Sequence, residues 1–452
     1  MNEVHNDVLL GKEEYLFLFQ GMHRQFDYLL KRKIVLPINI KNFIFNIKRR
    51  SSHFEKNKIK YIHIVFPSKP LVKRKFLPKG YANIDSLYNM YYKENCTSYE
   101  DNIFYALDLL ISLENEYSTF LKYDTHISDR GYLAIAKYIL DFFNIAYNKK
   151  LDSMFQKRLA SNDLSKKILK GKGLEEVLKI SNCNFYTIGN RSHLTGNGDE
   201  VTIYYNANIK ENKRLLIFGD SFLKDMLPIF SFHFKDIMYI RSQFIHYDIV
   251  KSFNPDMVIS GNAERYLSNV KSEKNANNFL MTKYGDNKYS PSKEYLDAFQ
   301  AQLSSYYYPH IYKEWEEKIK DIYSNPLNLT IKRLSKDIVL DKKEKEFSLF
   351  SITGVDSRII FNDICINKNK NYIFSIKFYS NVDSIFQLFY TTNESSEFSE
   401  RNSIKKEVLE GMNTITISLQ HIILGNRLRI DPLMNIGEVK IHDYRLEETN
   451  DK

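Results

Sequence analysis

The sequence predicts an α/β domain built on a doubly wound parallel sheet, followed by an all-β domain with the strand pattern of a β-sandwich. Three observations support this prediction. Apolar runs alternate with helix-period stretches up to about residue 285, most of these runs stop at glycine, proline or polar turn residues, and short alternating strands without helices follow residue 328. A chain of 452 residues is also too long for one ordinary core, so more than one domain is expected.

Four short apolar runs define the predicted parallel sheet. They span residues 60–66, 215–218, 236–240 and 256–260. Pro67 stops the first run, and Pro255 precedes the last. Helical periodicity predicts helices over residues 38–55, 133–143 and 223–234, and Pro228 kinks or restarts the third. Because function in such sheets lies at the carboxyl ends of the strands, the residues that follow the runs are the candidates.

The remaining segments complete the predicted organisation. Residues 150–210 carry several glycine turn signals, which indicate a loop-rich insertion that borders a substrate cleft. The expected boundaries are residues 1–285 for the α/β domain, 286–328 for an aromatic helical linker packed on it, and 329–452 for the β-sandwich. Sandwich strands are clearest at residues 371–378, 385–390 and 413–419.

Composition narrows the classes of function. Lysine and arginine total 65 against 55 aspartates and glutamates, a net charge of +10, but the basic clusters are short, which argues against nucleic-acid binding. Cys96, Cys183 and Cys365 are too far apart for a metal knuckle or a disulfide framework, so we expect buried side chains and no metal. The sequence shows no signal peptide and no membrane-spanning run, so the expected location is cytoplasmic, in solution or peripheral to the inner membrane.

The apolar run at residues 215–218 ends in Gly219, Asp220 and Ser221, which is typical of a tight turn from a strand into a helix. Such a turn exposes the serine hydroxyl and places the N–H groups of a helix start beside it, where they can stabilise an oxyanion. The alternative is that Ser221 only caps the following helix. The presence of a nearby base decides between these two interpretations.

A candidate base lies upstream, where Asp124 and His126 flank one residue just before the helix predicted at residues 133–143. Histidine is the usual general base near neutral pH, and a carboxylate beside it can orient the ring and stabilise the imidazolium. The alternative is a capping aspartate with a surface histidine, and Ser128 is a competing cap for the same helix.

A further candidate is Asn262, which follows Gly261 after the run at residues 256–260, at the same predicted sheet edge as Ser221. Its amide could donate to a developing oxyanion together with the Ser221 backbone N–H. The alternative is a simple loop after a strand. Glu264 and Arg265, which follow, are expected to form a local ion pair.

Asp124, His126 and Ser221 together resemble the site of the alginate O-acetyltransferase family, SGNH-hydrolase-like enzymes that modify bacterial exopolysaccharides. In that family a D-x-H motif precedes a G-[DT]-S serine, whereas ordinary SGNH esterases place the serine first, and this chain has the family's order. Further similarity lies at residues 11–17, 67–69, 255–259 and 264–267. The C-terminal domain resembles carbohydrate-binding jelly rolls at residues 426–432 and 437–441. Ile127 departs from the family, which often has tryptophan there, and so does Asn262.

The resemblance implies that Ser221 is the nucleophile, His126 the base and Asp124 the orienting carboxylate. The place of Asn262 beside Ser221 in the oxyanion hole is expected from its position at the sheet edge and not from the resemblance. The resemblance also implies transfer of an acetyl group through an acyl-serine to a hydroxyl of a capsular or lipopolysaccharide sugar. We expect no bound cofactor, acetyl-CoA as the donor, a polysaccharide acceptor, and membrane-associated glycan assembly proteins as partners. Two alternatives stay open: an SGNH carbohydrate esterase, and a glycan-binding or scaffold protein without catalysis. The jelly roll would hold the glycan or serve a structural role.

Overall fold

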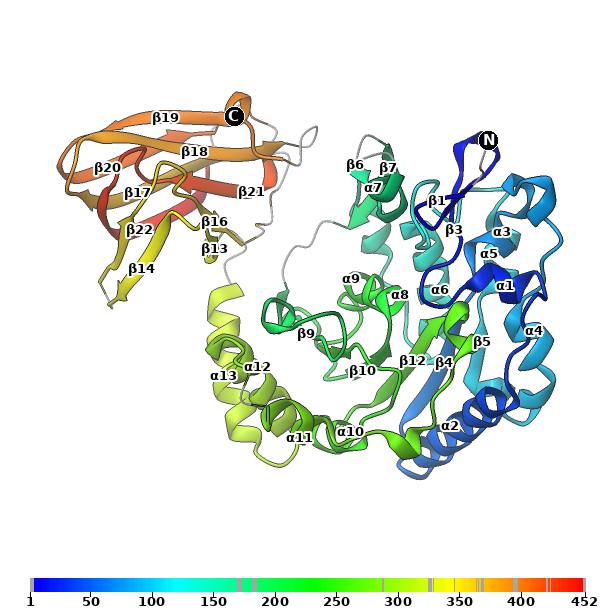
Figure 1. Ribbon diagram of the computed structural model, residues 1–452. Helices are drawn as coiled ribbons and strands as arrows, with labels where there is room; N and C mark the ends of the chain where they lie inside the picture. Colours follow the sequence, from blue (N-terminus) through cyan, green and yellow to red (C-terminus); the bar gives the residue numbers. More distant parts are fainter. Residues whose placement is uncertain are drawn as a thin grey trace. The chain divides into compact units, whose positions relative to one another are not determined.

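The computed structural model describes residues 4–168, 173–180, 185–286, 288–323, 327, 329–344, 346–362, 364, 366, 370–392, 397–419, 422 and 424–449. The chain forms two compact units, Met1–Ile180 with Phe185–Glu317, and Ser181–Asn184 with Lys318–Lys452 (Figure 1). Among the described helices, none combines the length and the apolar character needed to span a bilayer. Cys96 is buried, as predicted, and the other two cysteines lie outside the described residues.

The first unit is organised around a seven-stranded sheet in the order β5-β4-β12-β10-β11-β9-β8 (Figure 1). Its strands are β4 (Lys60–Phe66), β5 (Ile103–Tyr105), β8 (Tyr186–Gly189), β9 (Val201–Tyr205), β10 (Arg214–Gly219), β11 (Asp236–Ile240) and β12 (Met257–Ala263). The strands from β5 to β11 are parallel, and β9 and β8 add antiparallel pairs at one edge. The four predicted runs are therefore confirmed as neighbouring parallel strands.

Helices cover both faces of this sheet. In β4, Ile62 and Phe66 join the hydrophobic cluster that includes α6 (Asp129–Phe142), whereas Val65 joins the cluster that includes α2 (Pro37–Lys56). Since successive side chains of a strand point to opposite faces, these two clusters lie on opposite sides of the sheet. This is the layering predicted for a doubly wound sheet.

Two glycines allow β10 and β12 to approach closely at the carboxyl end of the sheet. Gly219 and Gly261 are register partners in the parallel pair. A Cβ atom added to Gly219 would lie 2.3 Å from the Gly261 carbonyl oxygen and 2.6 Å from a methyl group of Leu223. Because no side chain fits there, glycine lets β10 turn directly into α8 (Ser221–Lys224).

The helix predicted over residues 223–234 is present as two short helices, α8 and α9 (Leu227–Phe230). Pro228 lies in the first turn of α9, so the predicted restart at Pro228 is confirmed, and a first correction is that the helix ends at Phe230 and not at residue 234. Further helices and strands of this unit are β1 (Val4–His5), β2 (Val8–Leu10), β3 (Leu16–Leu18), α1 (Gln25–Leu29), α3 (Lys69–Val72), α4 (Leu87–Tyr91), α5 (Leu107–Leu113), α10 (Tyr247–Phe253), α11 (Phe279–Tyr284), α12 (Lys293–Ser304) and α13 (Pro309–Tyr323). The unit includes α13 only as far as Glu317.

The second correction concerns residues 150–210, which are not a loop-rich insertion. β8 and β9 extend the main sheet, and β6 (Phe155–Ser161) pairs with β7 (Leu174–Ile180) as an antiparallel ribbon, with α7 (Asp163–Ile168) between them. Strands at an edge or in a two-stranded ribbon keep polar side chains in water. They therefore lack the continuous apolar run that identifies a central strand.

The aromatic segment expected as a linker contacts the first unit through α12. Arg214 of β10 places Nη1 2.9 Å from Asp236 Oδ2, and its Nη2 donates to the backbone and side-chain oxygens of Gln302 at 2.8 and 3.0 Å. Gln302 in turn donates to Asp236 Oδ1 at 2.6 Å. A buried, fully partnered arginine thus fixes α12 to the amino ends of β10 and β11.

The second unit contains two five-stranded antiparallel sheets, in the orders β13-β16-β21-β18-β19 and β14-β15-β22-β17-β20. The strands are β13 (Ile331–Leu334), β14 (Ile338–Lys343), β15 (Ser348–Ile352), β16 (Ile359–Phe361), β17 (Asn371–Ser380), β18 (Ser384–Thr392), β19 (Ser403–Val408), β20 (Gly411–Ser418), β21 (Leu424–Asp431) and β22 (Gly437–Thr449). Phe374 of one sheet and Phe386 of the other share one core, with ring centroids 6.3 Å apart. The two sheets therefore pack face to face, as in a β-sandwich.

Candidate active site

Ser221 is the first residue of α8, directly after the central strand β10. Asp220 caps this helix, because its Oδ1 accepts from the Phe222 N–H at 3.0 Å, while its Oδ2 accepts from the Ala263 N–H of β12 at 2.9 Å. The Tyr239 hydroxyl of β11 lies 2.9 Å from the Asp220 carbonyl oxygen. The serine turn is thus fixed to both neighbouring strands, and the alternative in which Ser221 is the helix cap is wrong.

Asp124 and His126 lie in the loop that precedes α6. Ser128 caps α6, since its Oγ accepts from the Gly131 N–H at 3.2 Å. Asp124 instead faces the histidine: its Oδ1 accepts from the His126 N–H at 2.9 Å and lies 2.7 Å from the His126 Nδ1. The capping alternative for Asp124 is therefore also wrong, and its carboxylate orients the imidazole ring.

The loop and the serine turn meet at the carboxyl edge of the sheet. His126 Nε2 lies 2.9 Å from Ser221 Oγ, although the two residues are 95 positions apart. The Phe222 ring packs against the imidazole with centroids 4.9 Å apart, and the side chains of His126 and Asp124 are 22% and 14% exposed. These distances allow a proton to pass from serine to histidine, and the exposure leaves the site open to a substrate.

Charges around the imidazole favour its protonated form. Burial opposes a charge on His126, but the hydrogen bond with Asp124 and the charges of Asp225, Asp124 and Asp163 outweigh it, so the pKa of His126 is raised. Burial also opposes the charge on Asp124, yet its hydrogen bond and charge interaction with His126 hold the pKa of that carboxyl well below its usual range. His126 is consequently a stronger base than free imidazole.

Asn262 lies near the carboxyl end of β12, where it is the register partner of Val65 on β4. Its side chain lines a cavity of about 40 Å³ together with Phe43 and Arg50 of α2 and with Tyr266. The structure thus places Asn262 on the strand beside β10, at a cavity that residues of α2 also line. Donation from its amide to an oxyanion at Ser221 stays a prediction.

Glu264 and Arg265 do not form the expected ion pair. Glu264 is buried and accepts from the Ser68 N–H at 3.0 Å and from the Ser86 hydroxyl at 2.7 Å. Arg265 instead lies over the Phe222 ring, with its guanidinium carbon 5.4 Å from the ring centroid. The two neighbouring side chains leave their short helical turn in different directions.

Lys69 supports the loop that carries Asp124 and His126, a contact that the sequence did not suggest. Its side chain is 4% exposed, and its ammonium donates to the carbonyl oxygens of Leu16, Lys122 and Asp124 at 2.7, 2.9 and 2.9 Å. Burial lowers the pKa of Lys69 to about 7. The only signal in the sequence is its position directly after a buried strand, at the start of a helix.

Replacing Lys69 by methionine is expected to lower the free energy of unfolding of the first unit by about 2–4 kcal/mol, because three buried carbonyl oxygens lose their donor while the stem remains. Urea denaturation followed through Trp315, the single tryptophan of the chain, measures this. Lys79→Met, on the exposed surface, is the matched control and should stay within about 0.5 kcal/mol of the parent. An unchanged free energy in the Lys69 variant would contradict this role.

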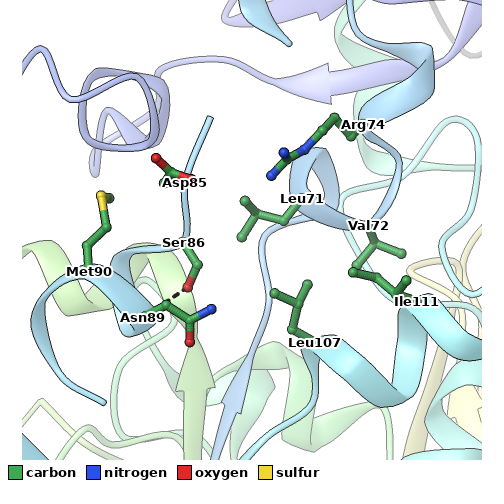
Figure 2. A pocket seen from close by; sticks show the side chains of 9 residues that line it. All are labelled: Leu71, Val72, Arg74, Asp85, Ser86, Asn89, Met90, Leu107 and Ile111. Carbon is green, nitrogen blue, oxygen red and sulfur yellow. Dashed lines mark hydrogen bonds between the residues drawn. The ribbon is translucent and has the colours of Figure 1, made fainter. Parts of the chain in front are cut away.

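A larger cavity of about 570 Å³ lies where the chain leaves β4 and β5 (Figure 2). It is lined by Leu71, Val72, Arg74, Asp85, Ser86, Asn89, Met90, Leu107 and Ile111. In Figure 2 the Leu71 and Leu107 side chains point toward its middle from α3 and α5, while the Asn89 N–H donates to Ser86 Oγ at 3.0 Å on its wall. This cavity shares no lining residue with the Asp–His–Ser arrangement.

No family model and no curated protein matches this chain. Among solved structures, PatB1 of Bacillus cereus is similar at 14% identity over 60% of this chain and 98% of that chain, with a TM-score of 0.40. The O-acetyltransferase domain of Pseudomonas putida AlgJ is similar at 14% identity over 61% and 98%, with a TM-score of 0.36. A carbohydrate-binding module, BiXyn10A CBM1, is similar at 8% identity over 26% and 86%, with a TM-score of 0.21. All three TM-scores are below 0.5, so these similarities assign no function.

Proposed function

We propose that this chain is a serine-dependent O-acetyltransferase that acts on a bacterial surface polysaccharide, such as a capsule or a lipopolysaccharide. The observation that carries the proposal is the hydrogen-bonded series from Asp124 through His126 to Ser221, with contacts of 2.7 and 2.9 Å. The order of these residues along the chain, which resembles that of the alginate O-acetyltransferase family, favours acetyl transfer to a glycan over simple hydrolysis.

The first proposed step forms an acetyl-serine. Ser221 Oγ attacks the acetyl carbonyl carbon of the donor as His126 Nε2 takes the serine proton, and Asp124 stabilises the imidazolium. The Ser221 backbone N–H, at the start of α8, and the Asn262 amide are the proposed donors to the oxyanion. With acetyl-CoA as the proposed donor, the carbon–sulfur bond then breaks, and the thiol leaves with the proton held by His126.

The second proposed step transfers the acetyl group. A sugar hydroxyl enters the place that the thiol left, and neutral His126 takes its proton as the oxygen attacks the acetyl-serine carbonyl. The bond to Ser221 Oγ breaks, and His126 returns the proton to this oxygen. The products are the sugar acetate ester and free Ser221, so no proton or electron is gained or lost. We propose that the second unit binds the acceptor glycan, on the resemblance of its sequence to jelly-roll modules.

The test is a transfer assay with the full chain, acetyl-CoA labelled in the acetyl group, and polysaccharide whose O-acetyl groups have been removed by mild base. The expected result is label in the polysaccharide that mild base releases as acetate. Release of acetate from an acetylated polysaccharide, without transfer to an acceptor, would replace the proposal by the esterase alternative. Glycan binding without turnover of any acyl ester would replace it by the non-catalytic alternative.

A further inference from the structure

The antiparallel ribbon of β6 and β7, whose strands are connected in the sequence through α7, contacts the loop that carries Asp124 and His126. The Glu175 carboxylate of β7 accepts from the N–H groups of Lys122 and Tyr123 at 2.5 and 2.9 Å. In return, the N–H groups of Leu164 and Ser165 in α7 donate to the Tyr123 carbonyl oxygen at 3.2 and 3.3 Å. The ribbon therefore holds the backbone of the loop immediately before Asp124.

Asp163, the first residue of α7, holds the next residue of the loop. Its Oδ1 accepts from the Thr125 N–H at 2.9 Å, and its Oδ2 accepts from the Thr125 hydroxyl at 2.6 Å. Thr125 is the residue between Asp124 and His126, and it is 9% exposed. One carboxylate thus accepts from both hydrogen-bond donors of Thr125, and the Thr125 hydroxyl oxygen also lies 3.4 Å from His126 Nδ1. These contacts fix the peptide that links Asp124 to His126.

The same carboxylate adds negative charge to the site. A carboxylate oxygen of Asp163, one of Asp124 and a ring nitrogen of His126 all lie within 4.8 Å of one another. Two neighbouring carboxylates repel each other, and a positive imidazolium beside them relieves this repulsion. A positive charge on His126, which appears when the serine is deprotonated, is therefore favoured by Asp163 as well as by Asp124 and Asp225.

We propose that Asp163 is a positioning residue of the active site, which holds His126 against Ser221 through Thr125 and strengthens His126 as a base through its charge. This inference rests on the proposed serine chemistry but not on the identity of the acyl donor or acceptor. The ribbon of β6 and β7, which the sequence presented only as part of an insertion, would then hold the loop of Asp124 and His126 in position.

The charges that surround His126 agree with this assignment. They are the carboxylates of Asp124 in its own loop, Asp163 of α7 and Asp225 after α8, the cation Arg265 over the Phe222 ring, and, at the Asp124 carbonyl, Lys69, whose pKa of about 7 makes it titrate within the pH range of the test. Burial and the charge of Asp124 raise the pKa of Asp163, while the charge of Asp163 contributes to the raised pKa of His126. Removing this charge should lower the pKa of His126.

The test measures the rate at which phenylmethylsulfonyl fluoride modifies Ser221 in the full chain, between pH 5 and 9 and with EDTA present, so that no bound cation influences the result. The reaction needs the nucleophile and its base but no acetyl donor or glycan. Asp163→Asn keeps the shape of the side chain and removes its charge. We expect the acidic limb of its profile to move to lower pH by about 0.5–1 unit and the plateau rate to fall about tenfold.

Two further variants separate position from charge. Thr125→Val removes the hydroxyl contacts with Asp163 and His126 but keeps the Asp163 carboxylate, so the plateau should fall while the limb moves less than in Asp163→Asn. Glu176→Gln, on the exposed side of the same ribbon, should change neither. If Asp163→Asn does not fold, as judged by circular dichroism, a Thr125→Val variant modified at the parental rate at every pH still overturns the positioning role.

The outcomes also distinguish this inference from the proposed function. If the parent chain is not modified at Ser221, the serine chemistry itself fails. If the parent is modified and folded Asp163→Asn shows the same plateau and the same limb, only the role of Asp163 fails. An equal shift in Glu176→Gln would show that any negative charge on the ribbon has this effect, and would likewise overturn the assignment.

Discussion

Replacing Ser221 by alanine is expected to reduce acetyl transfer by about 10⁴-fold or more, because the oxygen that forms the acyl-enzyme is absent. In the structure this oxygen lies 2.9 Å from His126 Nε2, so the variant lacks the hydroxyl from which His126 would take the proton. The transfer assay measures the rate, and intact mass spectrometry of the chain incubated with acetyl donor alone should show an added acetyl group that the variant lacks.

The matched control is Ser112→Ala, which removes an exposed serine hydroxyl from α5. It should transfer acetyl groups at the parental rate. Both variants should unfold at similar urea concentrations, since Asp220, not Ser221, caps α8. Parental transfer by Ser221→Ala would remove the nucleophile from the mechanism and with it the proposed function.

Replacing Asp124 by asparagine is expected to lower kcat/KM by about 10⁴-fold at the pH optimum, because an uncharged amide neither stabilises the imidazolium nor selects the ring tautomer that faces Ser221. The Asp124 carboxylate is the group in direct contact with His126 Nδ1, at 2.7 Å. Asp108→Asn, on the exposed face of α5, is the matched control and should keep full activity.

The proposed roles of Asp124 and His126 also predict the direction in which kcat/KM changes with pH. His126 must be neutral to accept the serine proton, so kcat/KM falls as the pH drops through the pKa of His126 and the ring becomes protonated. Because that pKa is raised in the folded chain, the midpoint of this acidic limb should lie above the ordinary histidine value of about 6.5. In Asp124→Asn the residual activity should show the limb at lower pH. A limb that stays in place would mean that another group titrates there.

Much of the first unit could be predicted from local patterns. The strands β4, β10, β11 and β12 are buried on both faces, so each is a continuous apolar run that the sequence shows directly. Pro67 follows β4, and β10 ends at Gly219, so turn residues mark the ends of these two strands. The ribbon strands β6 and β7 and the edge strand β8 could not be predicted in this way, because such strands mix polar and apolar residues much as loops do. The strand β9 lies between β11 and β8 and was missed although most of its residues are buried.

The candidate site, too, could be predicted only where its residues are close together in the sequence. The Gly219–Asp220–Ser221 turn and the Asp124–Thr125–His126 motif are visible in the sequence because each is local, and a known family order suggested that they belong together. Their contact, the brace from Asp163 and the three hydrogen bonds of Lys69 all join segments that are far apart in the chain. Local spacing carries no information on such pairs.

The sequence alone therefore determined which segments form the central buried strands, and it showed that Ser221 follows one of these strands and that Asp124 and His126 precede a helix. The tertiary structure decided which interpretation of those residues holds. Ser221 and Asp124 each had an alternative role as a helix cap, and both caps are taken by neighbours, Asp220 and Ser128. The physical reason is that a polar side chain bonds to whichever partner the packing brings within about 3 Å, and packing is a property of the whole sheet and its helices.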